Sequence, residues 1–310
     1  MKTILYRTSH ATLYEYSEPV SLCHNVFHLT ARNGPWQARW SSELRMSPPP
    51  TVMTERHDYF GNTATFATIE EPHFRLSVMA INVVELAPVP ACRSLSSPSW
   101  ETVGERLRSD RTPDLLAASQ FVYDSPYVPR SDRLAEFARP SFAPGRPLLD
   151  AALDLTARIH AEFRYDPTAT TIATPTLEVL QRRHGVCQDF AHLQIGCFRS
   201  LGLAARYMSG YLLSEVAPHR PGLLGAEASH AWVSVFCPRL GWIDFDPTNN
   251  LFPCDRHIVL AWGRDYDDVS PIKGVILGGG RHSMEVRVEI KRVPEHEIPQ
   301  LAQHRDEPPF

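Results

Sequence analysis

The stretch HGVCQDFAHL (residues 184–193) decides the fold of the second half of the chain, because it places a glycine turn directly before an apolar helix. Gly185 permits a tight turn, and the helix is predicted to begin near Cys187 and to end at Gly202. Apolar residues lie all round this helix, so we expect it to be buried on most sides. The stretch also holds one cysteine and two histidines, which are residue types that bind metals or act in catalysis.

The segments on either side of this helix predict an α+β unit. Upstream, apolar residues spaced by four, three, four and four form one helix face within 148–163, and another helix is expected after Thr174. Downstream, alternating residues predict strands at 204–213, 229–236, 241–246, 258–262, 273–277 and 284–293. Helices followed by an antiparallel sheet form an α+β domain, which we assign to residues 148–293.

The remainder of the chain divides into three further segments. Residues 1–90 alternate like strands and are separated by turn signals, which predicts an N-terminal antiparallel β-sandwich domain. Residues 91–147 are rich in proline and form a helical connector, with helices expected at 100–108 and 115–122. The polar tail 294–310 is expected to fray.

Composition limits the classes of function. The 310 residues carry 31 Lys and Arg against 35 Asp and Glu, a net charge of −4, so we expect no nucleic-acid partner. No stretch is apolar enough for a signal peptide or a membrane span, so we expect a soluble, cytoplasmic protein without a membrane partner, in which oligomerisation is possible. The six cysteines are scattered without a CxxC pair, which indicates reduced thiols.

Cys187 is a candidate nucleophile. A thiol at a helix N-terminus lies beside unpaired backbone N–H groups and the positive end of the helix dipole, which stabilise a thiolate and can receive an oxyanion. The alternative interpretation is a small core residue. His192 projects about 140° round the helix from Cys187 and is expected to be structural, whereas the direction of the His184 ring is open.

The base that a nucleophilic thiol needs is predicted to be His230, at the start of SHAWVSVF. If the hairpin register places Phe236 opposite Trp242, then His230 lies diagonal to Asp246 on one face of the sheet. Another register would turn one set of side chains to the opposite face. This register predicts a hydrogen bond between His230 and Asp246, with the second ring nitrogen turned to the thiol.

Several weaker assignments accompany this triad. Gln188, Trp232 and Tyr211 are candidate substrate or oxyanion residues, while Asp244 is expected to be a solvated strand residue. A metal site built from the nearby histidines and Cys187 is an alternative, but the spacing is not that of a helical zinc pair. We therefore expect neither a metal nor another cofactor.

The motifs GVCQDFAH, SHAWVSVF and GWIDFDPTN, in this order, resemble the transglutaminase-like superfamily, whose fold is related to papain-like cysteine peptidases. YEYSEPVSLCHNVFHLTAR, DYFGN, PHFRLSVMAINVVEL and HIVLAWGRDYDDVSPIKG resemble a bacterial branch with an N-terminal β domain, described as cysteine proteases. The resemblance implies that Cys187, His230 and Asp246 form a catalytic triad.

The implied activity is thiol-dependent acyl transfer on an amide or peptide bond. We expect hydrolysis of a peptide, a protein or a small amide. Transfer of the acyl group to an amine and a non-catalytic peptide-binding module are the alternatives. The loop 214–229 leads into His230 and is expected to form a wall or lid of the cleft, or else a surface insertion. Residues 278–280 (GGG) are expected to form a turn.

Overall fold

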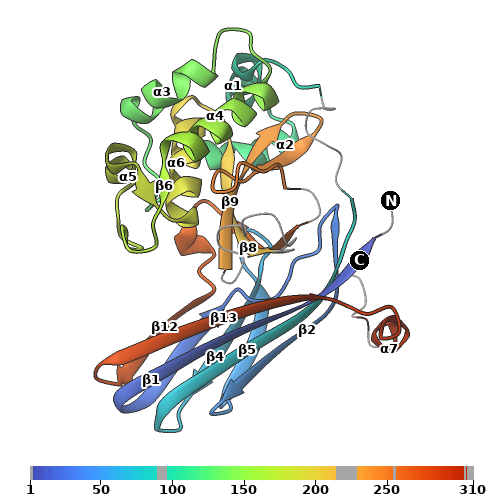
Figure 1. Ribbon diagram of the computed structural model, residues 1–310, viewed down its shortest axis with the longest axis vertical. Coiled ribbons are helices and arrows are strands. Elements are labelled where there is room, and N and C mark those ends of the chain that lie inside the picture. Colours follow the sequence, from blue (N-terminus) through green and yellow to red (C-terminus); the bar gives the residue numbers. More distant parts are fainter. Residues whose placement is uncertain (1–2, 89–95, 214–228, 254–255, 304, 306–310) are drawn as a thin grey trace.

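The computed structural model describes residues 3–88, 96–213, 229–253, 256–303 and 305. A helical layer lies at one end of the molecule and a large antiparallel sheet at the other, with a four-stranded sheet between them (Figure 1). The α+β class is as the sequence predicts. The expectations for the loop 214–229 fall almost entirely outside the described residues.

The large sheet is built around one very long strand, β1 (Ile4–Phe27). Its first half lies between β5 (His73–Leu86) and β13 (His282–Arg292), and its second half lies between β4 (Thr63–Ile69) and β12 (Ile272–Gly278). The pairing shifts between Glu15 and Val20, where Pro19 cannot donate to a ladder. The N-terminal strands are thus antiparallel as predicted, and β1 joins them into one sheet.

Two outer strands complete this sheet, namely β2 (Gln37–Ser47) on β5 and β3 (Val52–His57) on β4. Strands β12 and β13 come from the segment that we assigned to the C-terminal domain, yet both pair with β1, one after the other along it. Gly278, Gly279 and Gly280 lie between these two strands and have positive φ angles of 92°, 87° and 59°. They do not form the expected turn, because β12 and β13 run in the same direction along β1 and the glycines form an irregularity between them. The two ends of the chain therefore build one sheet together.

In the part of the chain that the structure describes, the helical layer contains six α-helices: α1 (Trp100–Ser109), α2 (Pro113–Ser119), α3 (Asp132–Ala138), α4 (Leu148–Glu162), α5 (Thr176–Arg182) and α6 (Cys187–Ser200). The short 3₁₀ segments η2 (Gln120–Val122) and η3 (Arg139–Ser141) lie among them. Buried side chains of α1, α2 and α3 share one hydrophobic core with α4 and α6, so the proline-rich connector packs as part of this layer. As expected, α6 is buried on most sides.

The four-stranded sheet has the order β10-β9-β8-β11 and is antiparallel throughout, with β8 (Ala205–Leu212), β9 (Ser229–Cys237), β10 (Gly241–Phe245) and β11 (His257–Gly263). Helix α6 packs against β9 and β8. Tyr211, Leu213, Ile258 and Leu260 join the apolar core of the N-terminal sheet. The two sheets are thus connected by apolar packing along β8 and β11.

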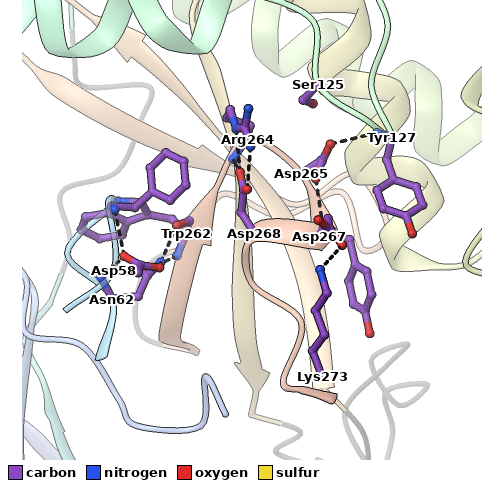
Figure 2. Close-up of polar contacts among 12 residues, drawn as sticks. Asp58, Asn62, Ser125, Tyr127, Trp262, Arg264, Asp265, Asp267, Asp268 and Lys273 are labelled. Carbon is purple, nitrogen blue, oxygen red and sulfur yellow. Dashed lines mark hydrogen bonds and ion pairs between the residues drawn. The ribbon is translucent and has the colours of Figure 1, made fainter. Parts of the chain in front are cut away.

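Two side-chain amides of the N-terminal domain pair with the outer edge of β11 in place of a fifth strand. The amide of Gln37 accepts from the Val259 N–H and donates to the Val259 carbonyl, both at 2.8 Å. The amide of Asn62 likewise accepts from the Trp262 N–H at 2.9 Å and donates to the Trp262 carbonyl at 2.8 Å (Figure 2). Unpaired strand edges otherwise expose backbone groups, so these amides protect the edge and fix β11 to the N-terminal domain.

The segment after β11 contacts both parts of the molecule (Figure 2). It includes η4 (Tyr266–Asp268), and each of its acidic residues has a partner. Asp265 is fully buried and accepts from the Tyr127 N–H at 2.9 Å. Asp267 pairs with Lys273, and Asp268 pairs with Arg264.

The polar tail does not fray where it is described. Helix α7 (Ile298–Ala302) places Ile298 and Leu301 against a small cluster that contains Leu5 and Val293. Among the described residues, no helix combines the length and the apolar character needed to cross a membrane.

Candidate active site

Cys187 is the first residue of α6 and follows a short parallel pairing of β6 (Arg164–Tyr165) with β7 (His184–Gly185). The carboxylate of Asp189 accepts from the Val186 N–H at 2.8 Å and from the Thr170 hydroxyl at 2.6 Å, which fixes the turn into the helix. A Cβ atom on Gly185 would lie 2.7 Å from the Asp189 Oδ2 atom. Glycine is therefore required at 185 by this close approach, as the turn before the thiol suggested.

The hairpin of β9 and β10 has the predicted register. Phe236 pairs with Trp242, so His230 and Asp246 come to the same face of the sheet. The His230 Nε2 atom donates to Asp246 Oδ2 at 2.8 Å, and both side chains are completely buried. The predicted hydrogen bond is confirmed.

The thiol of Cys187 interacts with the ring of His230, which joins α6 to the hairpin. Because Nε2 is bonded to Asp246 and Nδ1 is buried without any other hydrogen bond in the described chain, Nδ1 is the nitrogen left for the thiol. Burial favours the neutral ring, but the charge of Asp246, its hydrogen bond and the contact with Cys187 outweigh burial and raise the pKa of His230. The site therefore favours an imidazolium beside the thiol.

Asp246 is held by a dense set of donors. Its Oδ1 atom accepts from the backbone N–H groups of Thr248 and Asn249 at 2.9 and 3.2 Å, and its Oδ2 atom also accepts from the Asn249 amide at 3.0 Å. Burial would raise the pKa of Asp246, but the two adjacent histidines, His230 and His257, lower it well below its ordinary range. The carboxylate is thus kept charged and fixed in orientation.

His257 is the functional candidate that sequence reasoning missed. It begins β11, and its Nε2 atom lies 3.1 Å from the same Oδ2 atom of Asp246. The sequence offered only a histidine at the start of an alternating stretch, without any local sign of its partner. Two tyrosines near the thiol were also missed: burial and the nearby Cys187 raise the pKa of Tyr165 and of the fully buried Tyr207.

The weaker sequence candidates have different environments. Gln188 is half-buried beside the thiol. Trp232 is fully buried, stacks on His230 with ring centroids 6.0 Å apart, and donates to Asp244 at 2.9 Å. Asp244 is therefore not simply solvated. Tyr211 is fully buried in the core shared with the N-terminal sheet, so it is not at the rim of the site.

The two histidines of residues 184–193 have no contact with His230 or Asp246 among the interactions of the described residues. His184 is exposed. His192 is buried, stacks on Tyr127, and accepts from the Tyr266 N–H at 3.1 Å. Burial and the charge of Arg199 lower the pKa of His192 to about 3, so the ring is neutral and structural, as expected.

His230, Asp246 and His257 bring three possible metal-ligand atoms within 4.8 Å of one another. This cluster shares only His230 with the alternative that we considered from the sequence, which used His184, Cys187, His192 and His230. The Asp246 Oδ2 atom already accepts three hydrogen bonds, two of them from the other members of the cluster. The arrangement is explained as a hydrogen-bond network without a metal.

Comparisons with known proteins show the family to which the chain belongs. Residues 6–85 match the bacterial transglutaminase-like N-terminal region, and residues 135–247 match the transglutaminase-like superfamily. An uncharacterized protein of Mycobacterium tuberculosis (strain H37Rv) is 38% identical over 293 residues, covering 93% of this chain and 92% of the relative. Both matched regions include elements described above, namely β1 to β5 and the segment from α3 to β10.

Two further relatives are informative in different ways. A protein-glutamine gamma-glutamyltransferase of Pseudomonas aeruginosa is 29% identical over 133 residues, which is 40% of this chain and 19% of that protein. A crystal structure from Cytophaga hutchinsonii, provisionally described as a cysteine protease, superposes with a TM-score of 0.73 at 22% identity and covers 95% of this chain and 92% of that one. From the fold, the matched regions and the extent of these similarities, the chain belongs to the transglutaminase-like superfamily, with the bacterial transglutaminase-like N-terminal region.

Proposed function

We propose that the protein catalyses thiol-dependent acyl transfer from an amide or peptide bond, with Cys187 as nucleophile, His230 as acid and base, and Asp246 as the group that orients His230. The observation that supports this most directly is the buried His230, whose Nε2 atom is bonded to a charged Asp246 and whose Nδ1 atom has no other partner in the described chain, with Cys187 near enough to raise the pKa of the ring. A ring that is only structural has no need of a reactive group at both nitrogens.

The reaction proceeds in two halves. The Cys187 thiolate attacks the carbonyl carbon, and the negative charge that develops on oxygen is received by the free N–H groups at the N-terminus of α6. The His230 imidazolium donates its proton to the departing amine, so the C–N bond breaks and a thioester remains. Neutral His230 then takes a proton from the incoming water, which attacks the thioester and releases the acid and the thiol.

We propose hydrolysis as the principal outcome and a peptide, a protein or a small amide as the substrate. The structure from Cytophaga hutchinsonii, described as a protease, is compatible with this outcome. The Pseudomonas aeruginosa relative, a protein-glutamine gamma-glutamyltransferase, favours the second candidate, in which an amine replaces water as the acceptor. Both outcomes use the same thioester, and they differ in the molecule that attacks it. Gln188 remains a weak candidate for orienting the substrate.

The first test measures thiol reactivity residue by residue. We expect iodoacetamide to alkylate Cys187 at pH 6–7 much faster than a free cysteine, whereas Cys23, Cys197 and Cys237 are buried and should react slowly. Site-resolved mass spectrometry separates these thiols in the native protein. A Cys187 that reacts no faster than free cysteine would count against a nucleophile.

The second test measures activity on a panel of peptides and amides, with and without added primary amines. Wild type is compared with Cys187→Ala and with the control Cys237→Ala, which removes a buried thiol at the far end of β9. Hydrolysis releases an acid and transfer yields an amine adduct, and the two differ in mass. Products that persist in Cys187→Ala would exclude this mechanism.

A further inference from the structure

A second imidazole lies on the carboxylate of Asp246, although the proposed reaction needs only His230. The His257 Nε2 atom is 3.1 Å from Asp246 Oδ2, and the side chain of His257 is 3% exposed. The same oxygen accepts from His230 at 2.8 Å. Two rings from different strands thus share one carboxylate oxygen.

The surroundings of His257 determine its protonation state. A charged carboxylate can only accept, so the Nε2 atom of His257 carries its proton and donates. Its Nδ1 atom is buried and lacks a hydrogen-bond partner among the described residues, so a proton there would be an unsatisfied buried donor. Burial lowers the pKa of His257 despite the nearby charge of Asp246. His257 is therefore a neutral, permanent donor beside an imidazole that changes its charge.

The ring of His257 is held from two directions. Trp232 packs edge-on against it with centroids 4.9 Å apart, and the same indole stacks on His230. From the other side, His257 begins β11, whose edge is paired with the side chain of Gln37 two residues later. The position of His257 is therefore set partly by the N-terminal domain, for which the proposed chemistry has no other role.

We propose that His257 is a positioning residue for the dyad of His230 and Asp246: it holds the Asp246 oxygen toward His230, limits the negative charge on that oxygen, and depends on the N-terminal domain for its place. This inference rests on the proposed function. The ionisable groups that face the two rings are Cys187 from α6, Asp244 from β10 and Asp246 directly after it.

The test compares His257→Phe, which keeps a ring but removes the donor, with His257→Gln, whose amide can restore the donor. The readout is the rate of Cys187 alkylation by iodoacetamide between pH 5 and pH 12, because the pKa of His230 is raised to about 10. Without the donor, Asp246 carries more negative charge toward His230 and stabilises the imidazolium more strongly. The pKa of His230, seen as an inflection in the alkylation rate, should therefore rise by about one unit, which corresponds to the free energy of one hydrogen bond to a charged group. His257→Gln should return most of this shift.

A second measurement reads the protonation state of His257 in the wild-type protein. In wild type labelled with ¹⁵N-histidine, His257 should show the neutral form with its proton on Nε2 from pH 5 to pH 9; the signal is assigned by its loss in His257→Gln. A profile of His257→Phe that superposes on wild type, or a His257 found charged or protonated on Nδ1, overturns the inference. A wild-type Cys187 without enhanced reactivity at any pH instead overturns the proposed function, so the two failures are distinguishable.

Discussion

The pairing of Gln37 with β11 is expected to be a major support of the junction between the two domains. Gln37 is 8% exposed, and its amide donates to the carbonyls of Arg32 and Val259 at 2.7 and 2.8 Å while accepting from the Val259 N–H at 2.8 Å. Gln37→Met keeps the length of the side chain and removes all three hydrogen bonds. The carbonyl of Val259 retains the Arg32 N–H at 3.1 Å, but the Val259 N–H loses its acceptor.

The cost follows from these contacts. A buried N–H without an acceptor costs about 1–3 kcal/mol, and the other hydrogen bonds contribute roughly 0.5–1.5 kcal/mol each. Burying the methionine side chain offsets part of this loss, so the free energy of unfolding should fall by about 2–4 kcal/mol. For a chain of this size, that fall lowers the midpoint of urea unfolding by about 1 M.

Urea titration followed by tryptophan fluorescence measures this change, with Gln181→Met on the exposed face of α5 as the matched control. A third variant, Gln37→Glu, keeps the acceptor for Val259 but turns a negative charge toward two carbonyl oxygens. At pH 7, Gln37→Glu should lose more stability than Gln37→Met. This loss should diminish as the pH falls, because the new carboxyl is then protonated. If Gln37→Met costs no more than the control, or if Gln37→Glu shows no relief in acid, the pairing does not support the junction.

Three further outcomes are expected. Asp246→Asn should leave the fold intact but lower turnover by about 10³–10⁴-fold, because an amide cannot stabilise the imidazolium, and steady-state kinetics on any substrate found would measure this. Gly185→Ala places a methyl group 2.8 Å from the Asp189 Cβ atom and should cost about 1–3 kcal/mol in urea unfolding. His192 has a folded pKa of about 3 against 6.5 when free, so its unfolded form alone binds a proton between these values and stability falls as the pH falls; His192→Gln should flatten this slope by about 1.4 kcal/mol per pH unit.

Much of the candidate site follows from local patterns in the sequence. The turn at Gly185 and the helix that starts at Cys187 depend on residues close together in the chain, and the hairpin that brings His230 to Asp246 spans only 16 positions. The alternation of apolar residues fixes which face of a strand is buried, so the register could be deduced from the turn between the strands. The structure agrees with these predictions.

The contacts that the sequence did not reveal join distant segments. Strands β12 and β13 alternate as predicted, but alternation does not say which strand they will pair with, and their partner is β1 at the other end of the chain. The amides of Gln37 and Asn62 reach β11 across 222 and 200 positions, and no local pattern marks a glutamine or an asparagine as a substitute for a strand.

Local patterns in the sequence predict the groups of the proposed site, namely a thiol at a helix N-terminus and, for one hairpin register, a histidine and an aspartate on one face of a sheet. Only the tertiary structure decided how that chemistry is supported, through His257 on Asp246 and through the N-terminal sheet on β11. The physical reason is that helix starts and hairpin registers are set by the conformational preferences of neighbouring residues. The pairing of a buried polar group is instead set by whichever donor or acceptor the folded chain brings within reach.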